Sequence, residues 1–122
     1  MKKIITVIAI TLGTIVSAQA QSRFIVEGDT DLLYRDGVAT YGDNNGLTAL
    51  GWWRFVNKND TSVVERNLIQ VHCSSRLFRF IRIMEFRQSK VIYNSGENWS
   101  AQWENPVPGT LTEFFQDMCK IR

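Results

Sequence analysis

The sequence predicts an α+β domain, in which an antiparallel meander β-sheet is packed by a C-terminal α-helix and tied by one disulfide. Three observations support this fold class. Segments rich in β-branched and aromatic residues follow one another, separated by short runs of Gly, Asn, Asp and Ser. Apolar residues recur at helical spacing near the end of the chain, after Thr110. The chain also has two cysteines, Cys73 and Cys119.

The first 20 residues have the profile of a signal peptide. Two lysines precede an apolar run over residues 4–16, and Ala18 and Ala20 supply the small-x-small pattern that a signal peptidase accepts. The run is about 13 residues long, shorter than the roughly 20 that a membrane-spanning helix needs. We therefore expect cleavage after Ala20 and one exported domain over residues 21–122. A retained anchor is the alternative, and no charged stop-transfer flank supports it.

Cleavage makes the domain formally neutral. The chain has 14 basic and 12 acidic side chains, and loss of the two signal-peptide lysines leaves equal numbers of each. A neutral domain has no general electrostatic attraction to nucleic acid or to anionic lipid. We therefore expect no nucleic-acid partner.

The two cysteines are expected to pair, because disulfides persist in compartments beyond the inner membrane. The sequence separation of Cys73 and Cys119 is 46 residues, and in the chain-entropy model such a closure contributes on the order of 4 kcal/mol. A redox-active pair would more usually occur as Cys-x-x-Cys near a helix start. The spacing therefore favours a structural disulfide.

Six strands are expected in the mature chain. Gly28 and Asp29 divide residues 23–34 into a strand, a turn and a second short strand. Residues 36–47 are rich in Gly, Asn and Asp, which favour turns, so we expect a loop there. Aromatic and β-branched composition or period-two alternation predicts the other strands. These cover residues 49–56, 62–73, 76–87 and 91–93.

The segment 76–87 has the strongest strand signal. Strict alternation places apolar residues on both faces, which is typical of a central strand that is covered on both sides. It also puts Arg76 and Arg82 on one face and Arg79 and Arg87 on the other. We therefore expect no single patch of these four arginines, and their plain interpretation is solubility.

The final segment is predicted to be an amphipathic helix. Thr110 and Glu113 have the spacing of a capping box, in which each side chain satisfies a backbone N–H of the first turn. Cys119 follows the apolar stripe, so the disulfide is expected to fix this helix to the strand that carries Cys73. The stripe consists of Leu111, Phe114, Phe115 and Met118.

Several motifs between Val71 and Cys119 resemble the surface-adhesin protein E family of Gram-negative envelope proteins. They cover a strand that ends in cysteine, a charged aromatic strand, a short strand with a polar end, and a Trp-to-Thr stretch before the last helix. An early tyrosine-aspartate strand end is also similar. In order of description these are Val71-His72-Cys73, Arg76-Leu77-Phe78-Arg79-Phe80, Val91-Ile92-Tyr93-Asn94-Ser95, Trp103-Glu104-Asn105-Pro106-Val107-Pro108-Gly109-Thr110 and Leu33-Tyr34-Arg35-Asp36.

The resemblance implies a small disulfide-linked envelope domain that adheres to host matrix or serum glycoproteins. The chain departs from a surface adhesin at the cleavage site, where Gln21 stands in place of a lipobox cysteine. We therefore expect no lipid anchor and a periplasmic or secreted location. No ligand-contact residue is carried over from the family. The alternative function is a soluble periplasmic accessory protein that binds another envelope component.

Catalysis is not expected from this sequence. The one histidine, His72, has no serine or cysteine nucleophile and no acid in an identifiable arrangement around it. Neither a His-rich metal site nor a cofactor motif is present, so we expect no metal and no cofactor. The plain interpretation of His72 is a partly exposed strand residue.

Candidate binding residues come from the aromatic side chains. Trp52 and Trp53 are adjacent, so a regular strand points them to opposite faces, and one of them is expected to be exposed. We expect Trp53 and Trp103 in the core, while the sequence leaves Trp52 and Trp99 open between core and surface. Trp is common at binding hot spots, and loops on a rigid sheet often carry binding residues. The candidate ligand surface therefore consists of Trp52 with Tyr41 from the adjoining loop.

Overall fold

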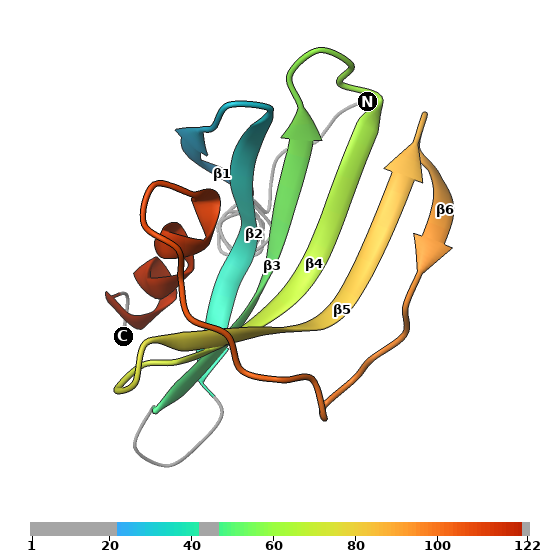
Figure 1. Cartoon of the computed structure of the whole chain (residues 1–122). Helices are drawn as coiled ribbons and strands as arrows, with labels where there is room; N and C mark the ends of the chain where they lie inside the picture. Colours follow the sequence, from blue (N-terminus) through green and yellow to red (C-terminus); the bar gives the residue numbers. More distant parts are fainter. Residues whose placement is uncertain (1–21, 42–46, 121–122) are drawn as a thin grey trace, which may run out of the picture.

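A computed structural model describes residues 22–41 and 47–120, which form one six-stranded antiparallel sheet and one helix (Figure 1). The strands pair in sequence order, β1-β2-β3-β4-β5-β6, so the predicted meander is confirmed. The predicted signal peptide lies outside the described residues. The elements are β1 (Ser22–Glu27), β2 (Asp31–Tyr41), β3 (Thr48–Asn57), β4 (Val63–His72), β5 (Leu77–Arg87), β6 (Lys90–Asn94) and the helix η1 (Leu111–Lys120).

Short turns with local side-chain chemistry connect the central strands. Between β3 and β4, the Asn57 side-chain oxygen accepts the backbone N–H groups of Asn59 and Asp60, at 2.9 and 3.0 Å. Between β5 and β6, Gln88 and Ser89 both have positive φ, 52° and 67°, as in the two-residue turns that match the twist of a hairpin. These turns keep successive strands adjacent, which gives the meander.

The expected loop over residues 36–47 is shorter than predicted. β2 continues through Asp36 to Tyr41 and pairs with β3 on both sides of a register shift between Asp36 and Thr40. Gly37 has a φ of 76°, a conformation that glycine adopts at little cost, so the strand passes the irregularity and continues. The prediction was wrong here because ladder pairing with β3 outweighs the turn preference of single residues. Asp36 consequently lies inside the sheet.

The final segment is helical as predicted, but η1 is a 3-10 helix and not an α-helix. A 3-10 helix rises about 2.0 Å per residue, against about 1.5 Å for an α-helix, and so reaches further with the same residues. Leu111 lies beside the β1–β2 turn, where a Cβ on Gly28 would lie 3.0 Å from its side chain. Cys119, near the other end, is bonded to Cys73 at the end of β4. The longer reach suits a segment that is fixed at both ends.

The start of η1 has a shifted form of the predicted capping box. The Thr110 hydroxyl accepts the N–H of Thr112 at 3.3 Å, one residue earlier in the helix than expected. Glu113 accepts the N–H of Gly109 at 3.4 Å, not that of Thr110. Both side chains still satisfy backbone donors at the helix start, which is the purpose of such a cap.

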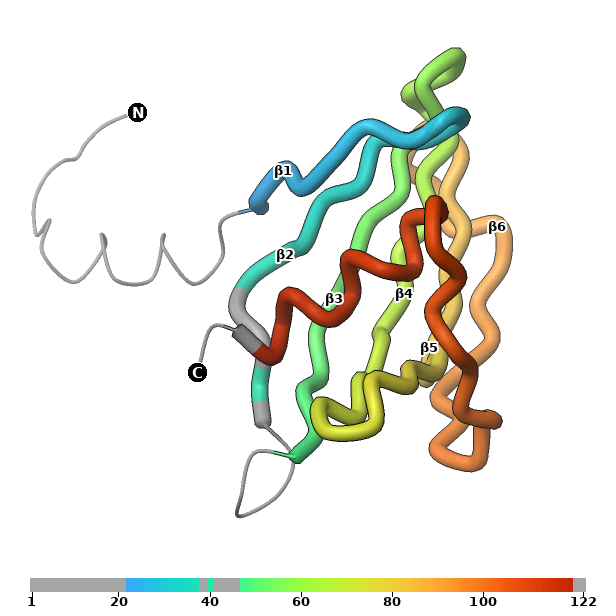
Figure 2. Tube along the Cα trace, turned by 60° about the vertical axis from the view of Figure 1, so that its left-hand side comes forward, coloured from blue at the N-terminus to red at the C-terminus, as the bar shows by residue number. Residues whose placement is uncertain are grey.

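The hydrophobic core lies between η1 and one face of the sheet, which we call the helix face. Figure 2 shows η1 lying across the sheet, and its main contacts are with β3 and β4. Phe115 is fully buried at the centre, and its ring is edge-on to those of Trp53, Phe55, Phe78 and Phe80 at centroid distances of 5.1 to 6.2 Å. The other fully buried side chains of this core are Leu33, Ala49, Ile69, Val71 and Met118.

The disulfide closes this core. Cys73 and Cys119 are bonded with a Cα–Cα separation of 5.8 Å, so the predicted pairing is confirmed. Both cysteines pack against the core cluster. The covalent bond therefore holds the end of η1 on the same buried surface that Phe115 fills.

Candidate binding face

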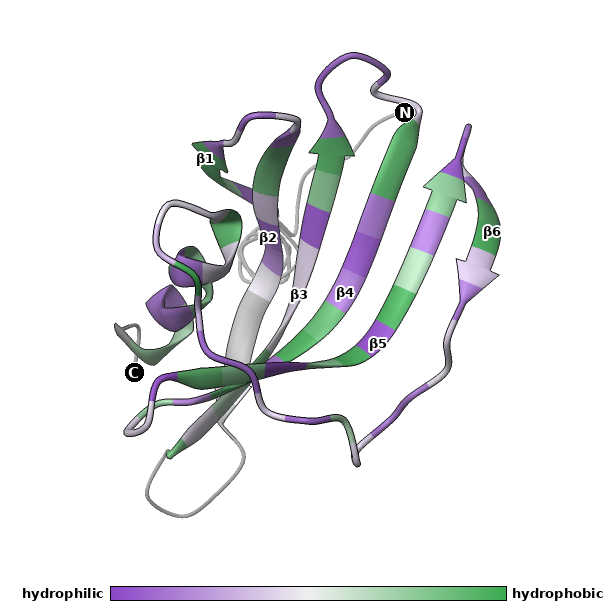
Figure 3. Ribbon diagram, in the orientation of Figure 1, coloured by the Kyte–Doolittle hydropathy of each residue, from purple (hydrophilic) through white to green (hydrophobic). Residues whose placement is uncertain are grey.

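The face of the sheet opposite η1 is the candidate functional site, and we call it the open face. Cross-strand partners in an antiparallel sheet share a face, and residues two apart along a strand do so as well. Within residues 22–41 and 47–120, no helix lies on this face. Polar residues interrupt the apolar ones along β3, β4 and β5 (Figure 3). The pairing assigns Tyr34, Asp36, Trp52, Arg54, Arg66, Leu68, Arg79, Arg82, Met84 and Phe86 to the open face.

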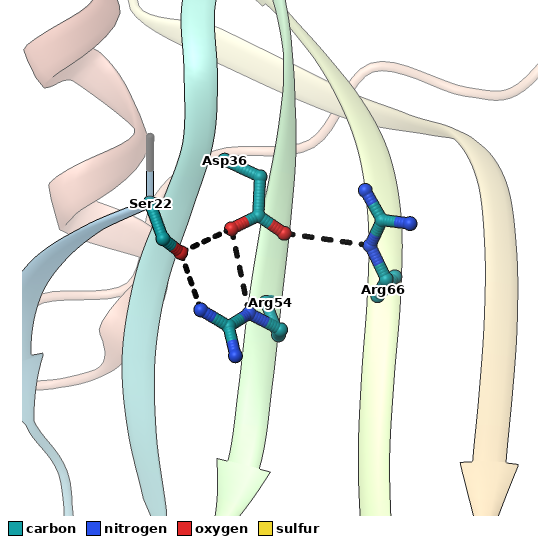
Figure 4. Close-up of polar contacts among 4 residues, drawn as sticks. All are labelled: Ser22, Asp36, Arg54 and Arg66. Carbon is teal, nitrogen blue, oxygen red and sulfur yellow. Dashed lines mark hydrogen bonds and ion pairs between the residues drawn. The ribbon is translucent and has the colours of Figure 1, made fainter. Parts of the chain in front are cut away.

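Asp36 is the centre of a polar network that takes one residue from each of four adjacent strands (Figure 4). Its Oδ1 accepts the Ser22 hydroxyl at 2.6 Å and lies 3.4 Å from Nε of Arg54. Its Oδ2 lies 3.4 Å from Nε of Arg66. An Nη group of Arg54 also donates to the Ser22 hydroxyl, which closes the network. One carboxylate therefore fixes two guanidinium groups on neighbouring strands.

The position of Asp36 has an electrostatic reason. Arg54 and Arg66 are direct cross-strand partners in the β3–β4 ladder, and like charges in that arrangement repel. The Asp36 carboxylate lies between them and offsets this repulsion. All three side chains are partly exposed, at 29, 37 and 21% for Arg54, Arg66 and Asp36, so each ion pair contributes about 1 kcal/mol or less. The network orients the arginines more than it stabilises the fold.

Aromatic rings hold the arginine side chains from a second direction. The guanidinium of Arg54 lies 4.4 Å from the ring centroid of Tyr34, and that of Arg66 lies 5.1 Å from the Trp52 ring. Such cation–π contacts contribute about 0.5 to 1 kcal/mol at exposed sites. The charged groups are thereby held over the aromatic rings, and a partner meets arginine side chains with restricted rotamers.

The predicted separation of Arg79 from Arg82 was wrong because β5 contains a bulge, whereas Arg82 and Arg87 lie on opposite faces as predicted. Leu68 pairs with Arg82 and the next residue, Ile69, pairs with Phe80, so Ile81 has no partner of its own on β4. The extra residue reverses the alternation along β5. Arg79, whose partner is Gln70, therefore shares the open face with Arg82.

Both β5 arginines are oriented by neighbouring groups. Nε of Arg79 donates to the side-chain oxygen of Gln70 at 2.9 Å, and an Nη donates to the carbonyl of Ala101 at 3.2 Å. Nε of Arg82 donates to the Asn94 side chain at 3.0 Å. Together with Arg54 and Arg66, these side chains extend the basic surface across β3, β4 and β5.

A cavity opens on the same face between the start of β4 and the end of β5, beside the β3–β4 and β5–β6 turns. Its volume is 390 Å³, and Val64 and Phe86 supply apolar walls while Arg66 borders it. Thr61, Ser62, Gln88 and Ser89 complete the lining. A cavity of this kind accepts an apolar side chain next to a positive charge.

The structure describes the side chain of only one of the two candidate binding residues, Trp52 and Tyr41. Trp52 is half-buried on the open face against Arg66. Tyr41 pairs with Ala49, three residues from Trp52 along β3, and its side chain lies outside the described residues, as do residues 42–46 of the expected loop. The grouping of these two residues in one ligand surface stays a prediction.

The other tryptophans divide between core and surface. Trp53 is fully buried, as predicted. Trp103 was predicted to be in the core, but it is 36% exposed. It lies in the segment after β6, outside the regular strands, and stacks on Arg79 at 4.4 Å and against His72. Trp99 is 48% exposed and donates to Glu97 at 3.1 Å.

The open-face residues that the sequence analysis missed are Tyr34, Asp36, Arg54 and Arg66. Alternation within each segment could have predicted that Tyr34 and Asp36 share one face of their strand and that Trp52 and Arg54 share one face of theirs. No signal in the sequence gave the cross-strand register that brings these pairs together.

His72 has structural neighbours. Its Nδ1 lies 3.0 Å from the Ser75 hydroxyl and 3.3 Å from the Ser75 backbone nitrogen, and its ring packs edge-on against Trp103. Among the described residues, no three His, Cys, Asp or Glu side chains are grouped closely enough to hold a metal ion. In the same part of the chain, no helix has the length and apolar character needed to cross a membrane.

The helix face beyond η1 has the opposite charge character. Glu65 there is half-buried, and burial raises its pKa, with a further contribution from the negative charge of Glu85. These two residues, with Asp31, line a smaller cavity of 160 Å³ against Phe55 and Ile92. Most of the carboxylates on β2 to β5 thus lie on the helix face and most of the arginines on the open face.

Comparisons of the chain with family models, curated proteins and solved structures find no match. The resemblance to surface-adhesin protein E stays a prediction from the sequence motifs. The arginine and aromatic side chains of the open face are therefore the features that bear on function.

Proposed function

We propose that the mature domain is an exported, non-catalytic binding module of the cell envelope. It engages a protein or glycoprotein partner through the open face. The observation that supports this most is the set of stacked, ion-paired arginines on a sheet face that no helix of the described residues covers. Trp, Tyr and Arg are the residue types that dominate binding hot spots.

The organisation of the open face suits binding for a second reason. Association normally costs conformational entropy when long side chains become fixed at the interface. Arg54 and Arg66 are already fixed by Asp36 and by the aromatic rings. A partner therefore meets donors whose orientation is largely set before contact.

The proposed location is the periplasm or the outside of the cell. The profile of the first 20 residues and the Cys73–Cys119 disulfide support an oxidising compartment. Host matrix or serum glycoproteins are the partner class that the resemblance to the adhesin family suggests. The open face provides the contact residues for such a partner.

A soluble periplasmic accessory role is the second candidate, and the edge strand β6 favours it. Val91, Ile92 and Tyr93 are each about half exposed on this strand. An exposed apolar edge can add a strand from another protein through main-chain hydrogen bonds. An envelope component with an extended segment would be the partner in that case.

Cell fractionation followed by capture separates the two roles. The mature domain is first assigned to periplasm, outer membrane or medium, and it is then tested against purified matrix glycoproteins and against the envelope fraction. We expect Trp52→Ala to weaken capture by about 2 kcal/mol, in the range of interface anchors, and the exposed Trp99→Ala control to leave it unchanged. Equal capture by both variants would contradict binding through the open face.

The accessory role predicts a different pattern. The domain would bind one envelope protein at fixed stoichiometry. Ile92→Pro in β6 would abolish this binding, because proline removes a backbone N–H donor from the edge strand. The Trp52→Ala variant would then bind as the unmodified domain does.

A further inference from the structure

Charge is divided unevenly between the two faces of the sheet, although the mature chain is expected to be neutral. On β2 to β5, the helix face has the carboxylates Asp31, Glu65 and Glu85, with Arg35 and Arg87 beside them. On the same strands, the open face has one carboxylate and four arginines. These are Asp36, Arg54, Arg66, Arg79 and Arg82.

The arginines of the open face are arranged to bind further acceptors. Nε of Arg79 and Nε of Arg82 each donate a hydrogen bond to a neighbouring side chain, whereas Nε of Arg54 and Nε of Arg66 each lie 3.4 Å from Asp36 in an ion pair without a hydrogen bond. Within the described part of the chain, the Nη atoms of Arg66 and Arg82 have no acceptor. A guanidinium that is held at Nε presents its Nη donors in a fixed direction, which suits a planar carboxylate.

Asp36 shows that a carboxylate fits this surface. Its two oxygens are shared between Arg54, Arg66 and the Ser22 hydroxyl. It offsets only part of the positive charge, because Arg79 and Arg82 have neutral partners at Gln70 and Asn94. The surface therefore attracts additional anionic groups of the same kind.

The cavity beside Arg66 supplies the second recognition element. Val64 and Phe86 form its apolar walls, and its volume of 390 Å³ is sufficient for a large apolar side chain. Arg66 borders the cavity and belongs to the basic surface as well. One ligand can therefore place an apolar group in the cavity and a carboxylate on Arg66.

We propose that the open face binds an acidic polypeptide segment that carries an apolar anchor. Its carboxylates pair with Arg66 and Arg82, and its anchor side chain fills the cavity between Val64 and Phe86. This inference rests on the proposed function and defines the chemistry of the partner. A sulfated glycan matches the arginines but has no apolar side chain for the cavity, so a polypeptide fits both features better.

Fluorescence anisotropy with a labelled synthetic peptide tests the proposal. The probe alternates Glu with small residues and contains a single Trp. In one matched peptide every Glu is replaced by Gln, and in the other the Trp is replaced by Ala. The mature domain with its disulfide intact is titrated with each peptide, with a heparin oligosaccharide and with phosphatidylglycerol vesicles.

The acidic Trp peptide is expected to bind, and each peptide change is expected to weaken binding by about tenfold or more. Arg66→Gln and Arg82→Gln cause a similar loss, and added salt weakens binding by screening. The control is Arg87→Gln, which removes the same charge from the helix face. Thermal melts confirm that each variant is folded, and the peptide variants test the same contacts without altering the protein.

Two results would overturn the proposal. One is peptide binding that Arg66→Gln and Arg82→Gln leave unchanged. The other is binding of heparin or vesicles in preference to every peptide. If either occurs while Trp52→Ala still abolishes glycoprotein capture, the peptide chemistry fails and the proposed function stands. If the peptide binds as expected but no glycoprotein is captured, the peptide chemistry stands and the proposed binding of glycoproteins fails.

Discussion

The two faces of the sheet use aromatic residues in different ways. On the helix face, Trp53 and Phe115 are fully buried and pack edge-to-face at 5.1 Å. On the open face, Trp52 and Tyr34 are partly exposed and stack on arginines. Adjacent residues of one strand thus take part in two kinds of interaction. Residue type alone therefore does not distinguish a core aromatic from one on a recognition surface. The group that each ring contacts does distinguish them: another aromatic ring in the core, and a guanidinium on the open face.

The faces should also differ in what they contribute to stability. Large buried side chains each contribute several kcal/mol, because their removal leaves a cavity. Partly exposed ion pairs contribute about 1 kcal/mol or less. Variants of the helix face should therefore change stability strongly, and variants of the open face should mainly change binding.

The largest effect on stability is expected from Phe115→Ala. Phe115 is fully buried and its ring lies against four other aromatic rings, so its removal leaves a large cavity. We expect a loss of about 3 to 5 kcal/mol in the free energy of unfolding. Chemical denaturation of the mature domain measures it. A loss below about 1 kcal/mol would show that η1 does not anchor the core.

The next largest effect is expected from Cys119→Ser. This change opens the 46-residue loop and frees the end of η1 from Cys73. We expect a loss of about 2 to 4 kcal/mol in the free energy of unfolding. The control is the unmodified domain with dithiothreitol, which should be destabilised to the same extent. A variant as stable as the oxidised domain would contradict a structural role for the disulfide.

A smaller effect is expected from Asp36→Asn, which removes the negative charge between Arg54 and Arg66. The free energy of unfolding should fall by about 1 kcal/mol or less, because the ion pairs are partly exposed. Binding of the acidic Trp peptide should become tighter, since both guanidiniums lose their internal carboxylate. Anisotropy titration and denaturation of the same sample measure the two quantities. Weaker peptide binding would show that Asp36 is needed to orient the arginines.

The smallest effect is expected from Glu65→Gln on the helix face. Burial raises the pKa of Glu65 in the folded state, and the charge of Glu85 raises it further. Ionised Glu65 therefore destabilises the fold above its folded-state pKa, and the penalty disappears below the unfolded value of about 4.3. The variant should have a higher Tm at pH 7, and the gain should shrink as the pH falls through the carboxyl range. A gain that persists unchanged below about pH 4 would point to packing instead.

Much of the helix face could be predicted from the sequence. The strand segments, the apolar stripe with Phe115 and the Cys73–Cys119 pair all follow from local composition, spacing and the number of cysteines. Local patterns are informative here because each element needs one apolar face, and that requirement appears within a few residues. The 3-10 form of η1 was not predicted, because it depends on contacts at both ends of the segment.

The open face could be predicted only in part. Trp52 was identified, but the partners that give it a role depend on register between strands far apart in sequence. The bulge at Ile81, which has no partner on β4, is the clearest case. This one extra residue in β5 moves Arg79 to the same face as Arg82. Nothing in the composition of residues 76–87 marks the position of that bulge. Recognition surfaces built across strands therefore need the register, which single-strand patterns do not contain.

The indole N–H signals of Trp52 and Trp53 in an NMR titration test the separation of the two faces most directly. These residues are neighbours in β3, and their rings lie on the open face and in the core, respectively. On addition of the acidic Trp peptide to nitrogen-15-labelled mature domain, we expect the Trp52 signal to shift progressively while the Trp53 signal stays in place. A shift of Trp53 with no change at Trp52 would contradict the account, because the peptide would then bind through the core side of the sheet.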